Sequence, residues 1–393
     1  MSLQILAGVE EVSKSVLAPY DEHICDFLND WSALLRSDAE AKTYPDVMSF
    51  SFWCRKGNVL QLKEAYEKRE LGYRIGRGMV FHIAPSNVAV NAAFTYVFGL
   101  LAGNANVVRV SSKQHPQIIC LCRILNQVLH RREYQDILQI TSFVSYDRDE
   151  DYTVSYSAGC DARVIWGGDD TIQTVRRIPI PVRAVEMTFA DRYSFGILDG
   201  EYLKTLNDAG WRSLVHGFYN DTYLMDQNAC STPHLLFWIQ ADSETKEKFW
   251  QMVYEKALQY DLSDQKVSDK YTQLNEVCVL HPEITKITRY ENYIYVIDLV
   301  REKMSKDASL CYRGKFGMFF QTDLHTLDEL PDFLDNRVQT CAVAGINPQK
   351  MKDIIFVRKC FGIDRIVPFG KTLDIGVVWD GYDMIQQLSR VIV

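Results

Sequence analysis

The sequence lacks the features that would assign the chain to nucleic-acid-binding, exported or membrane proteins. Its 43 Lys and Arg residues are outnumbered by 51 Asp and Glu residues, so a formal net charge of -8 leaves no general positive field for a polyanion. The opening MSLQILAGVEEVSKSV contains two glutamates where a signal peptide needs an apolar core. No apolar run reaches the roughly 20 residues of a bilayer-spanning helix. We therefore expect a cytoplasmic protein that neither spans a membrane nor binds nucleic acid.

The ten cysteines lack the spacing of a metal site or of a disulfide scaffold. They are spread along the whole chain, without paired Cys-x-x-Cys or Cys/His motifs. Cys120 and Cys122 are close in sequence, but residues two apart lie on different faces of a helix and are badly placed to ligate one ion. The sequence predicts that most cysteines are reduced core residues and that there is no metal site.

The order of apolar segments predicts two α/β domains. After an N-terminal helical segment at residues 1–71, short β-rich runs alternate with helical stretches, which is typical of a doubly wound parallel sheet. We expect one α/β domain at residues 72–199, a second at residues 200–361 and a C-terminal tail at residues 362–393. The cleft between two such domains is the default place for an active site.

Three segments, taken in order, point to a family. They are the turn APSN at residues 84–87 followed by GNANVVRVSSKQHP, then VIWGGDD, and then AVEMTFADRYSFGILDG followed by QNACSTP. This order resembles the aldehyde dehydrogenase superfamily. Within it, QNACSTP and the tail GIDRIVPFGKTLDIGVVWDGYDMIQQLSR look like the LuxC-type fatty acyl-CoA reductases. The resemblance implies an aldehyde dehydrogenase-like fold of two doubly wound α/β domains, the first binding NADP and the second carrying a nucleophilic cysteine, with the active site in the cleft between them.

Cys230, in QNACSTP, is the expected nucleophile. It stands in a polar loop just before an apolar, strand-like run, where a thiolate can face a cleft. The alternative is an inert core thiol, because unpaired cysteine is among the most buried residue types. His216 and His234 flank this loop, but the sequence offers no third group to orient either of them, which disfavours a Cys-His hydrolase.

The resemblance also gives roles to Asn87 and Glu186. Asn87 corresponds to the asparagine that donates a hydrogen bond to the oxyanion, and Glu186 to the superfamily's general base. Each has a structural alternative. Asn87 or Ser86 can cap the following helix, and Glu186 can form an ion pair with Arg183 or Arg192.

The expected cofactor is NADPH. By resemblance, Arg109 takes the place of a ribose-contacting lysine, and Ser112 replaces an acidic residue that would repel a 2′-phosphate. With Ser111 and Lys113 they form a candidate phosphate site. Phe316 corresponds to a residue near the nicotinamide ribose, although Gly314 stands where the family has a glutamate. The other cofactor-binding candidates are Pro85, Ser86, Gly167 and Gly168, the two glycines because they let the backbone approach the pyrophosphate.

The activity implied by the resemblance is NADPH-dependent reduction of a long-chain acyl-CoA or other acyl thioester to the aldehyde, through an acyl-cysteine. Three alternatives stay open: an acyl-carrying subunit fed by an acyl ligase or an acyl carrier protein, a non-acylating aldehyde dehydrogenase, and a cofactor-binding protein without catalysis. The expected partners are the acyl substrate, such a ligase or carrier protein, and a second copy of the chain in a homodimer.

Overall fold

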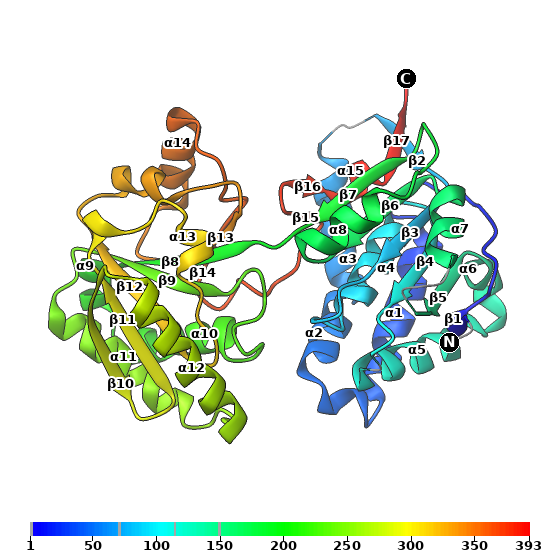
Figure 1. Cartoon of the computed structure of the whole chain (residues 1–393). Coiled ribbons are helices and arrows are strands. Elements are labelled where there is room, and N and C mark those ends of the chain that lie inside the picture. Colours follow the sequence, from blue (N-terminus) through cyan, green and yellow to red (C-terminus); the bar gives the residue numbers. More distant parts are fainter. Residues whose placement is uncertain (1–2, 70–71, 114, 148–150) are drawn as a thin grey trace. The chain divides into compact units, whose positions relative to one another are not determined.

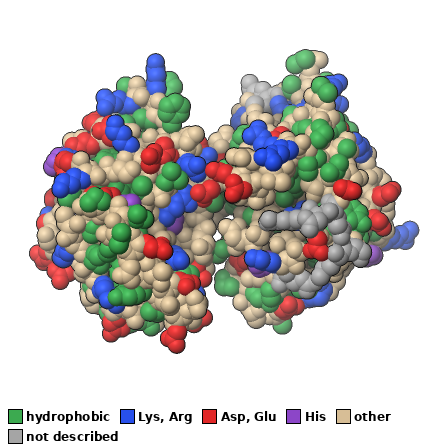
Figure 2. Space-filling view, in the orientation of Figure 1, with side chains coloured by type: hydrophobic (Ala, Val, Ile, Leu, Met, Phe, Trp, Pro, Cys, Tyr) green, Lys and Arg blue, Asp and Glu red, His purple; other side chains and the backbone are tan. Residues whose placement is uncertain are grey.

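The chain forms two compact units, shown in the computed structural model of Figure 1. Unit 1 comprises Met1–Ala190 and Val377–Val393, and unit 2 comprises Asp191–Gly376. The structure describes residues 3–69, 72–113, 115–147 and 151–393. Among these residues, no helix has both the length and the apolar character needed to cross a membrane. On the face shown in Figure 2, acidic, basic and hydrophobic side chains are interspersed over the surface of each unit.

Unit 1 is built on a six-stranded sheet with the order β1-β5-β4-β3-β6-β7. Neighbouring strands are parallel, except that β1 runs antiparallel to β5 at the edge. From β3 the chain moves outward through β4 to β5 and then crosses to β6 on the other side of β3, which is the doubly wound order. The strands are β1 (Gln4–Gly8), β3 (Met79–Ile83), β4 (Ala105–Val110), β5 (Thr141–Ser145), β6 (Ala162–Trp166) and β7 (Val185–Phe189).

The helices of unit 1 bury apolar faces against this sheet and one another. Helix α4 is buried along almost its whole length and packs on β3 and β4. The helices are α1 (Glu22–Ser37), α2 (Pro45–Trp53), α3 (Lys56–Glu67), α4 (Asn91–Leu101), α5 (Pro116–Leu129), α6 (Gln135–Gln139), α7 (Tyr152–Gly159), α8 (Asp169–Arg176) and α15 (Met384–Gln387), with 3₁₀ turns at Ala41–Thr43 and Arg132–Tyr134. Two small sheets pair β2 (Tyr73–Gly76) with β17 (Ser389–Ile392), and β15 (Val378–Trp379) with β16 (Tyr382–Asp383).

Unit 2 repeats the doubly wound plan in a seven-stranded sheet with the order β10-β11-β12-β9-β8-β13-β14. Only β10 is antiparallel to its neighbour. The strands are β8 (Tyr193–Asp199), β9 (Pro233–Ile239), β10 (Ile284–Tyr290), β11 (Ile294–Leu299), β12 (Met318–Leu324), β13 (Val338–Ala344) and β14 (Arg365–Pro368). The helices are α9 (Gly200–Thr205), α10 (Asp208–Thr222), α11 (Ser243–Ala257), α12 (Asp264–Leu280), α13 (Ala308–Cys311) and α14 (Pro348–Arg358), with 3₁₀ turns at Arg301–Lys303 and Leu327–Phe333. The prediction of two doubly wound α/β domains is confirmed.

The compact units have different boundaries from the predicted domains. Strand β8 belongs to unit 2 because it pairs with β9 and β13, so the division falls at residue 190 and not at 199. The predicted N-terminal segment is part of unit 1: β1 completes its sheet, and Trp31 of α1 packs edge-on against Phe50 and Tyr96. The predicted tail is divided, because β14 pairs with β13 in unit 2 and β17 pairs with β2 in unit 1.

One buried carboxylate, Asp221 of α10, holds the segment that follows β14. It accepts hydrogen bonds from the backbone N–H groups of Gly370 (2.6 Å) and Thr372 (3.1 Å). Burial raises the pKa of Asp221 to about 7 in spite of these bonds. The segment Gly370-Lys371-Thr372 is therefore a turn held by Asp221.

Replacing Asp221 by Asn should destabilise unit 2, because the amide has one acceptor oxygen where the carboxylate uses two. We expect the free energy of unfolding to fall by about 1–3 kcal/mol in urea titrations at neutral pH. The pKa of Asp221 is higher in the folded protein than in the unfolded chain. Ionisation of Asp221 therefore lowers the free energy of unfolding of the wild type as pH rises from about 4 to about 7. That part of the pH dependence should disappear in the variant; identical pH slopes would contradict the assignment.

Candidate functional site

The doubly wound order of unit 1 brings the predicted cofactor residues to one edge of the sheet. Strands β4, β3 and β6 are adjacent and parallel, so the loops at their carboxyl ends lie side by side. The crossover from one half of the sheet to the other falls between β3 and β6, and such a switch point is the usual place for a nucleotide. The predicted residues at this edge are Pro85, Ser86 and Asn87 after β3, Ser111 and Ser112 after β4, and Gly167 and Gly168 after β6.

The turn after β3 does not cap the next helix. Helix α4 begins at Asn91, and its N-cap position, Val90, provides no side-chain hydrogen bond. The capping alternative for Ser86 and Asn87 is therefore wrong, and both residues are exposed. The turn is tied to the start of α5 instead, because Nε2 of His115 lies 2.9 Å from the carbonyl oxygen of Ser86.

The residues proposed for phosphate recognition follow β4. The guanidinium of Arg109 lies over the ring of Tyr146, 5.1 Å from its centroid. The Ser111 hydroxyl accepts a hydrogen bond from the Lys113 N–H (3.2 Å). Ser111 and Lys113 line a pocket of about 350 Å³ beside β1 and α5, which is within the size range of small-molecule sites. Ser112 is exposed.

The two glycines after β6 leave the backbone accessible. Gly168 is the N-cap of α8, and a Cβ atom added there would meet no atom within 4 Å. A Cβ atom at Gly167 would lie 3.2 Å from the Thr171 side chain. Asp169 and Asp170 place negative charge in the first turn of α8, so this helix end attracts a phosphate less than a bare N-terminus does. A ligand here would contact the glycine backbone.

Cys230 lies in unit 2, in the loop between α10 and β9, and is half-buried. Its carbonyl oxygen accepts a hydrogen bond from the Ser194 hydroxyl (2.7 Å) at the start of β8. Thr232 braces the loop twice, through its N–H to the Ala229 carbonyl (2.9 Å) and its hydroxyl to the Asp221 carbonyl (2.9 Å). The loop thus holds Cys230 at the amino end of the parallel sheet.

The other nine cysteines differ from Cys230 in their surroundings. All ten are free thiols, and six of the nine are buried, as predicted. Burial raises the pKa of Cys25 and Cys160 to about 11 and that of Cys122 to about 12, which keeps these thiols neutral. Among the exposed or half-buried ones, Cys278 lies on the surface of α12.

A family model described as acyl-CoA reductase (LuxC) matches residues 57–271 of the 393, a range that includes both the Asn87 turn and the Cys230 loop. The chain belongs to the LuxC acyl-CoA reductase family. No curated protein matches the sequence.

Solved structures of aldehyde dehydrogenases share the fold of this LuxC-family chain. An NAD-dependent benzaldehyde dehydrogenase from Corynebacterium glutamicum superimposes with a TM-score of 0.62 at 13% identity, covering 95% of this chain and 84% of that one. Aldehyde dehydrogenase 21 from Physcomitrella patens gives 0.64 at 12% identity, covering 94% and 84%. A 1-pyrroline-5-carboxylate dehydrogenase from Thermus with bound NAD gives 0.63 at 13% identity, covering 94% and 80%. The resemblance stated from the sequence is confirmed at the level of family and fold.

Glu186 of the LuxC-family chain is held in ion pairs within unit 1. One carboxylate oxygen accepts hydrogen bonds from the guanidinium of Arg163, including one from Nε at 2.7 Å, and the other accepts one from Nε of Arg176 (2.9 Å). Arg163 is 2% exposed and faces Glu186 across the β6–β7 pair. The ion-pair alternative is therefore present, with Arg163 and Arg176 in place of the expected Arg183 and Arg192.

The flanking histidines do not form a Cys-His pair. His234 is buried against Tyr193, and its Nδ1 accepts a hydrogen bond from the Gly314 N–H (3.3 Å). Burial lowers the pKa of His234 to about 3, so the ring stays neutral. His216 is exposed, and its Nε2 lies 3.3 Å from the side-chain nitrogen of Asn220.

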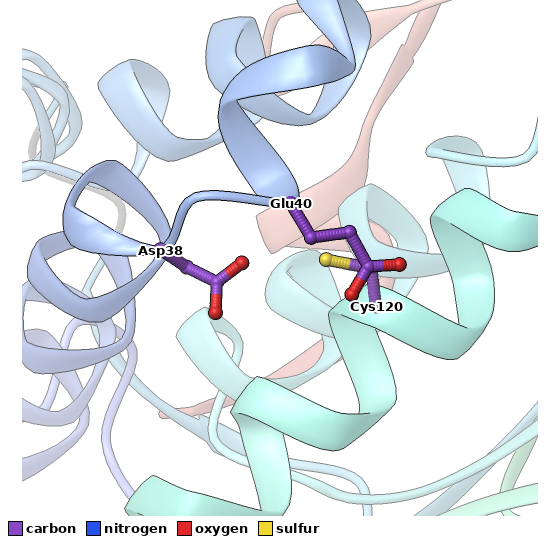
Figure 3. Close-up of side chains that lie close together, drawn as sticks. All are labelled: Asp38, Glu40 and Cys120. Carbon is purple, nitrogen blue, oxygen red and sulfur yellow. The ribbon is translucent and has the colours of Figure 1, made fainter.

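Three metal-ligating side chains do cluster in unit 1, at Asp38, Glu40 and Cys120 (Figure 3). Arg123, however, places Nη2 2.9 Å from Asp38, 3.0 Å from Glu40 and 3.7 Å from the Cys120 sulfur. A guanidinium donating to both carboxylates fills the role that a cation would have. We interpret the cluster as an ion-pair network.

Two buried residues that contact the turn before β12 were not predicted. Gln227 is buried under the turn that carries Phe316, and Lys270 donates to the Phe316 carbonyl from the other side. Burial lowers the pKa of Lys270 to about 7. The place of Gln227 in the motif QNACSTP could have indicated a role for it. Lys270 ends the polar stretch DQKVSDK, which gives no sign that this side chain is buried.

Proposed function

We propose that the chain reduces an acyl thioester to the aldehyde, with NADPH as the reductant and Cys230 as the nucleophile. The observation that carries the proposal is the family match, which spans both the strand-end loops of unit 1 and the Cys230 loop. The braced, half-buried position of Cys230 supports it, because a nucleophile must be both held and reachable.

The groups at the carboxyl edge of unit 1 fit a dinucleotide. Gly167 and Gly168 would face the pyrophosphate with their backbone, beside the turn that contains Pro85 and Ser86. Arg109, Ser111 and Ser112 would hold the 2′-phosphate by charge-assisted hydrogen bonds. In unit 2, Phe316 would contact the nicotinamide ribose. When bound, NADPH supplies the hydride that reduces the acyl group.

The chemistry at Cys230 begins with attack of its thiolate on the thioester carbonyl carbon. Asn87 donates a hydrogen bond to the oxyanion that forms, and the CoA thiolate leaves and takes up a proton. Exchange of one thioester for another is nearly balanced in free energy, so binding energy can go into stabilising the oxyanion. After the acyl group is reduced, the tetrahedral oxyanion collapses: its bond to the Cys230 sulfur breaks, the electron pair returns to sulfur and the aldehyde leaves.

This sequence needs no activated water, and we assign Glu186 no catalytic step. Both of its carboxylate oxygens are engaged in hydrogen bonds with guanidinium groups of unit 1. We propose that Glu186 stabilises the buried charge of Arg163.

The test of the proposed function is to mix the protein with NADPH and acyl-CoAs of increasing chain length and to follow the absorbance of the reduced cofactor. We expect consumption of NADPH with release of free CoA and aldehyde. Oxidation of free aldehydes to acids, without turnover of any acyl-CoA, would support the non-acylating alternative instead.

Cys230 should be the cysteine that carries the acyl group. Incubation with acyl-CoA in the absence of NADPH should add one acyl mass, located at Cys230 by peptide mapping, and should protect Cys230 from iodoacetamide. Cys278 is the internal control, since it is exposed and should be alkylated whether or not acyl-CoA is present. Cys230→Ala should bind NADPH yet form no adduct, whereas Cys278→Ala should behave as wild type; an adduct on the Cys230→Ala variant would refute the assignment.

Ser112→Glu should weaken the binding of NADPH more than that of NADH. A carboxylate facing the 2′-phosphate repels it by a few kcal/mol at an effective dielectric constant near 20, and the exposure of this position reduces the effect by screening. We expect about a tenfold rise in the Kd of NADPH, measured by fluorescence titration, and little change for NADH. Ser112→Ala controls for loss of the hydroxyl; equal losses for both cofactors would place the phosphate elsewhere.

A further inference from the structure

One buried side chain, Gln227, joins the Cys230 loop to the turn before β12. Gln227 is 3% exposed. Its Oε1 accepts hydrogen bonds from the N–H groups of Gly317 (2.6 Å) and Met318 (3.2 Å), and its Nε2 donates to the Met318 carbonyl (3.1 Å). The amide therefore pairs with both backbone groups of Met318, as a neighbouring strand would.

Both segments joined by Gln227 have backbone conformations that need support. Asp226 and Gln227 have φ angles of 53° and 59°, and Phe316 and Gly317 have φ angles of 54° and 90°. The left-handed region is unfavourable for residues other than glycine, so neighbouring contacts must hold it. At Gly317 a Cβ atom would lie 2.1 Å from the Tyr293 carbonyl oxygen, so this position of the turn has no space for a side chain.

Lys270 fixes the same turn from α12. Its side chain is buried, and Nζ donates to the Phe316 carbonyl (2.7 Å) and to the carbonyls of Asn292 and Tyr293. The turn is thus anchored to α12 by Lys270 and to the Cys230 loop by Gln227. Of these two, only Gln227 connects the turn with the loop that bears the nucleophile.

We propose that Gln227 is a positioning residue that keeps the Phe316 turn in register with Cys230. The inference rests on the proposed function, in which Cys230 carries the acyl group and Phe316 contacts the nicotinamide ribose. Acylation of Cys230 does not involve the Phe316 turn, whereas reduction requires the Cys230 loop and the Phe316 turn at a fixed separation. Loss of the Gln227 amide should therefore slow reduction of the acyl-enzyme far more than its formation.

The first experiment replaces Gln227 by Met, which has a similar volume and no hydrogen-bonding amide. Acylation is followed by intact mass after mixing with acyl-CoA alone, and reduction by a single-turnover reaction after NADPH is added to the acyl-enzyme. We expect acylation within about threefold of wild type and reduction slower by about ten- to a hundredfold.

Gln321→Met is the matched control. Gln321, on β12, is 6% exposed, accepts hydrogen bonds from the indole N–H groups of Trp238 and Trp250 (both 2.8 Å), and donates to Asp298 (2.7 Å). It loses the same number of buried hydrogen bonds in the same unit, at a place that does not touch the Cys230 loop. We expect a lower melting temperature and an unchanged ratio of reduction to acylation.

Gln227→Glu adds a readout that simple destabilisation does not move. A buried carboxyl group has a raised pKa, and its neutral form presents one acceptor oxygen and one O–H donor, as the amide does. The reduction rate of this variant relative to wild type should therefore rise as pH falls from about 8 to about 6. If Gln227→Met does not fold, Gln227→Glu by itself tests whether Gln227 positions the Phe316 turn.

Three results would count against the inference. Equal slowing of acylation and reduction in Gln227→Met, or the same ratio as in Gln321→Met, would show that Gln227 only stabilises the fold. A pH-independent ratio for Gln227→Glu would do the same. Failure of the wild-type protein to form an acyl adduct on Cys230 is distinguishable from these, because it would overturn the proposed function and this inference with it.

Discussion

Parallel strand pairing decides where every candidate functional residue of this LuxC-family protein lies. In a parallel sheet all strands begin at one edge and end at the other. Strand pairing alone therefore brings loops that are distant in sequence close together. In unit 1 the loops after β3, β4 and β6 share the carboxyl edge. In unit 2 the groups around Cys230 share the amino edge: Ser194 at the start of β8, Cys230 before β9 and Gly317 before β12. The remaining contacts adjust positions that this pairing has already set.

Buried polar groups keep the strands at these edges in place. Between β3 and β4, the His82 ring lies 2.7 Å from the Thr95 hydroxyl and 2.9 Å from the Asn106 side-chain oxygen, and burial lowers its pKa to about 4. The ring is therefore neutral and fully partnered, and it links two strands to α4. In unit 2, the hydrogen bonds of Gln227 likewise link the loop before β9 to the start of β12. The side chains of His82 and Gln227 are buried, and each has hydrogen-bond partners for its polar atoms. Such satisfied buried groups favour one specific arrangement of the strands as well as stabilising it.

The sequence was sufficient for the fold and for the family, because alternating strands and helices, and motifs in a fixed order, are local signals. It was insufficient wherever the outcome depended on pairing between distant segments. The ion-pair alternative for Glu186 named Arg183 and Arg192, since only strand register places Arg163 opposite Glu186. Strand β8 was assigned to the wrong domain because an apolar run does not reveal its neighbours. The capping roles of Ser86 and Asn87 failed because α4 begins several residues further on.

Unit 1 is discontinuous in sequence, and this has a consequence for the order of folding. Strand β17 pairs with β2 across more than 300 residues, and Arg74 of β2 donates to the carbonyl oxygens of Gln386 (2.7 Å) and Ser389 (3.1 Å). Unit 2 is a single uninterrupted segment inserted into unit 1. During synthesis, unit 2 can therefore reach its native contacts before unit 1 is complete, and unit 1 has to keep an unpaired β2 edge open while the whole of unit 2 is made. The pairing of β17 with β2 joins the two segments of unit 1 and can form only after unit 2 has been translated. Unit 1 is therefore the first unit to begin synthesis and the last to complete its contacts.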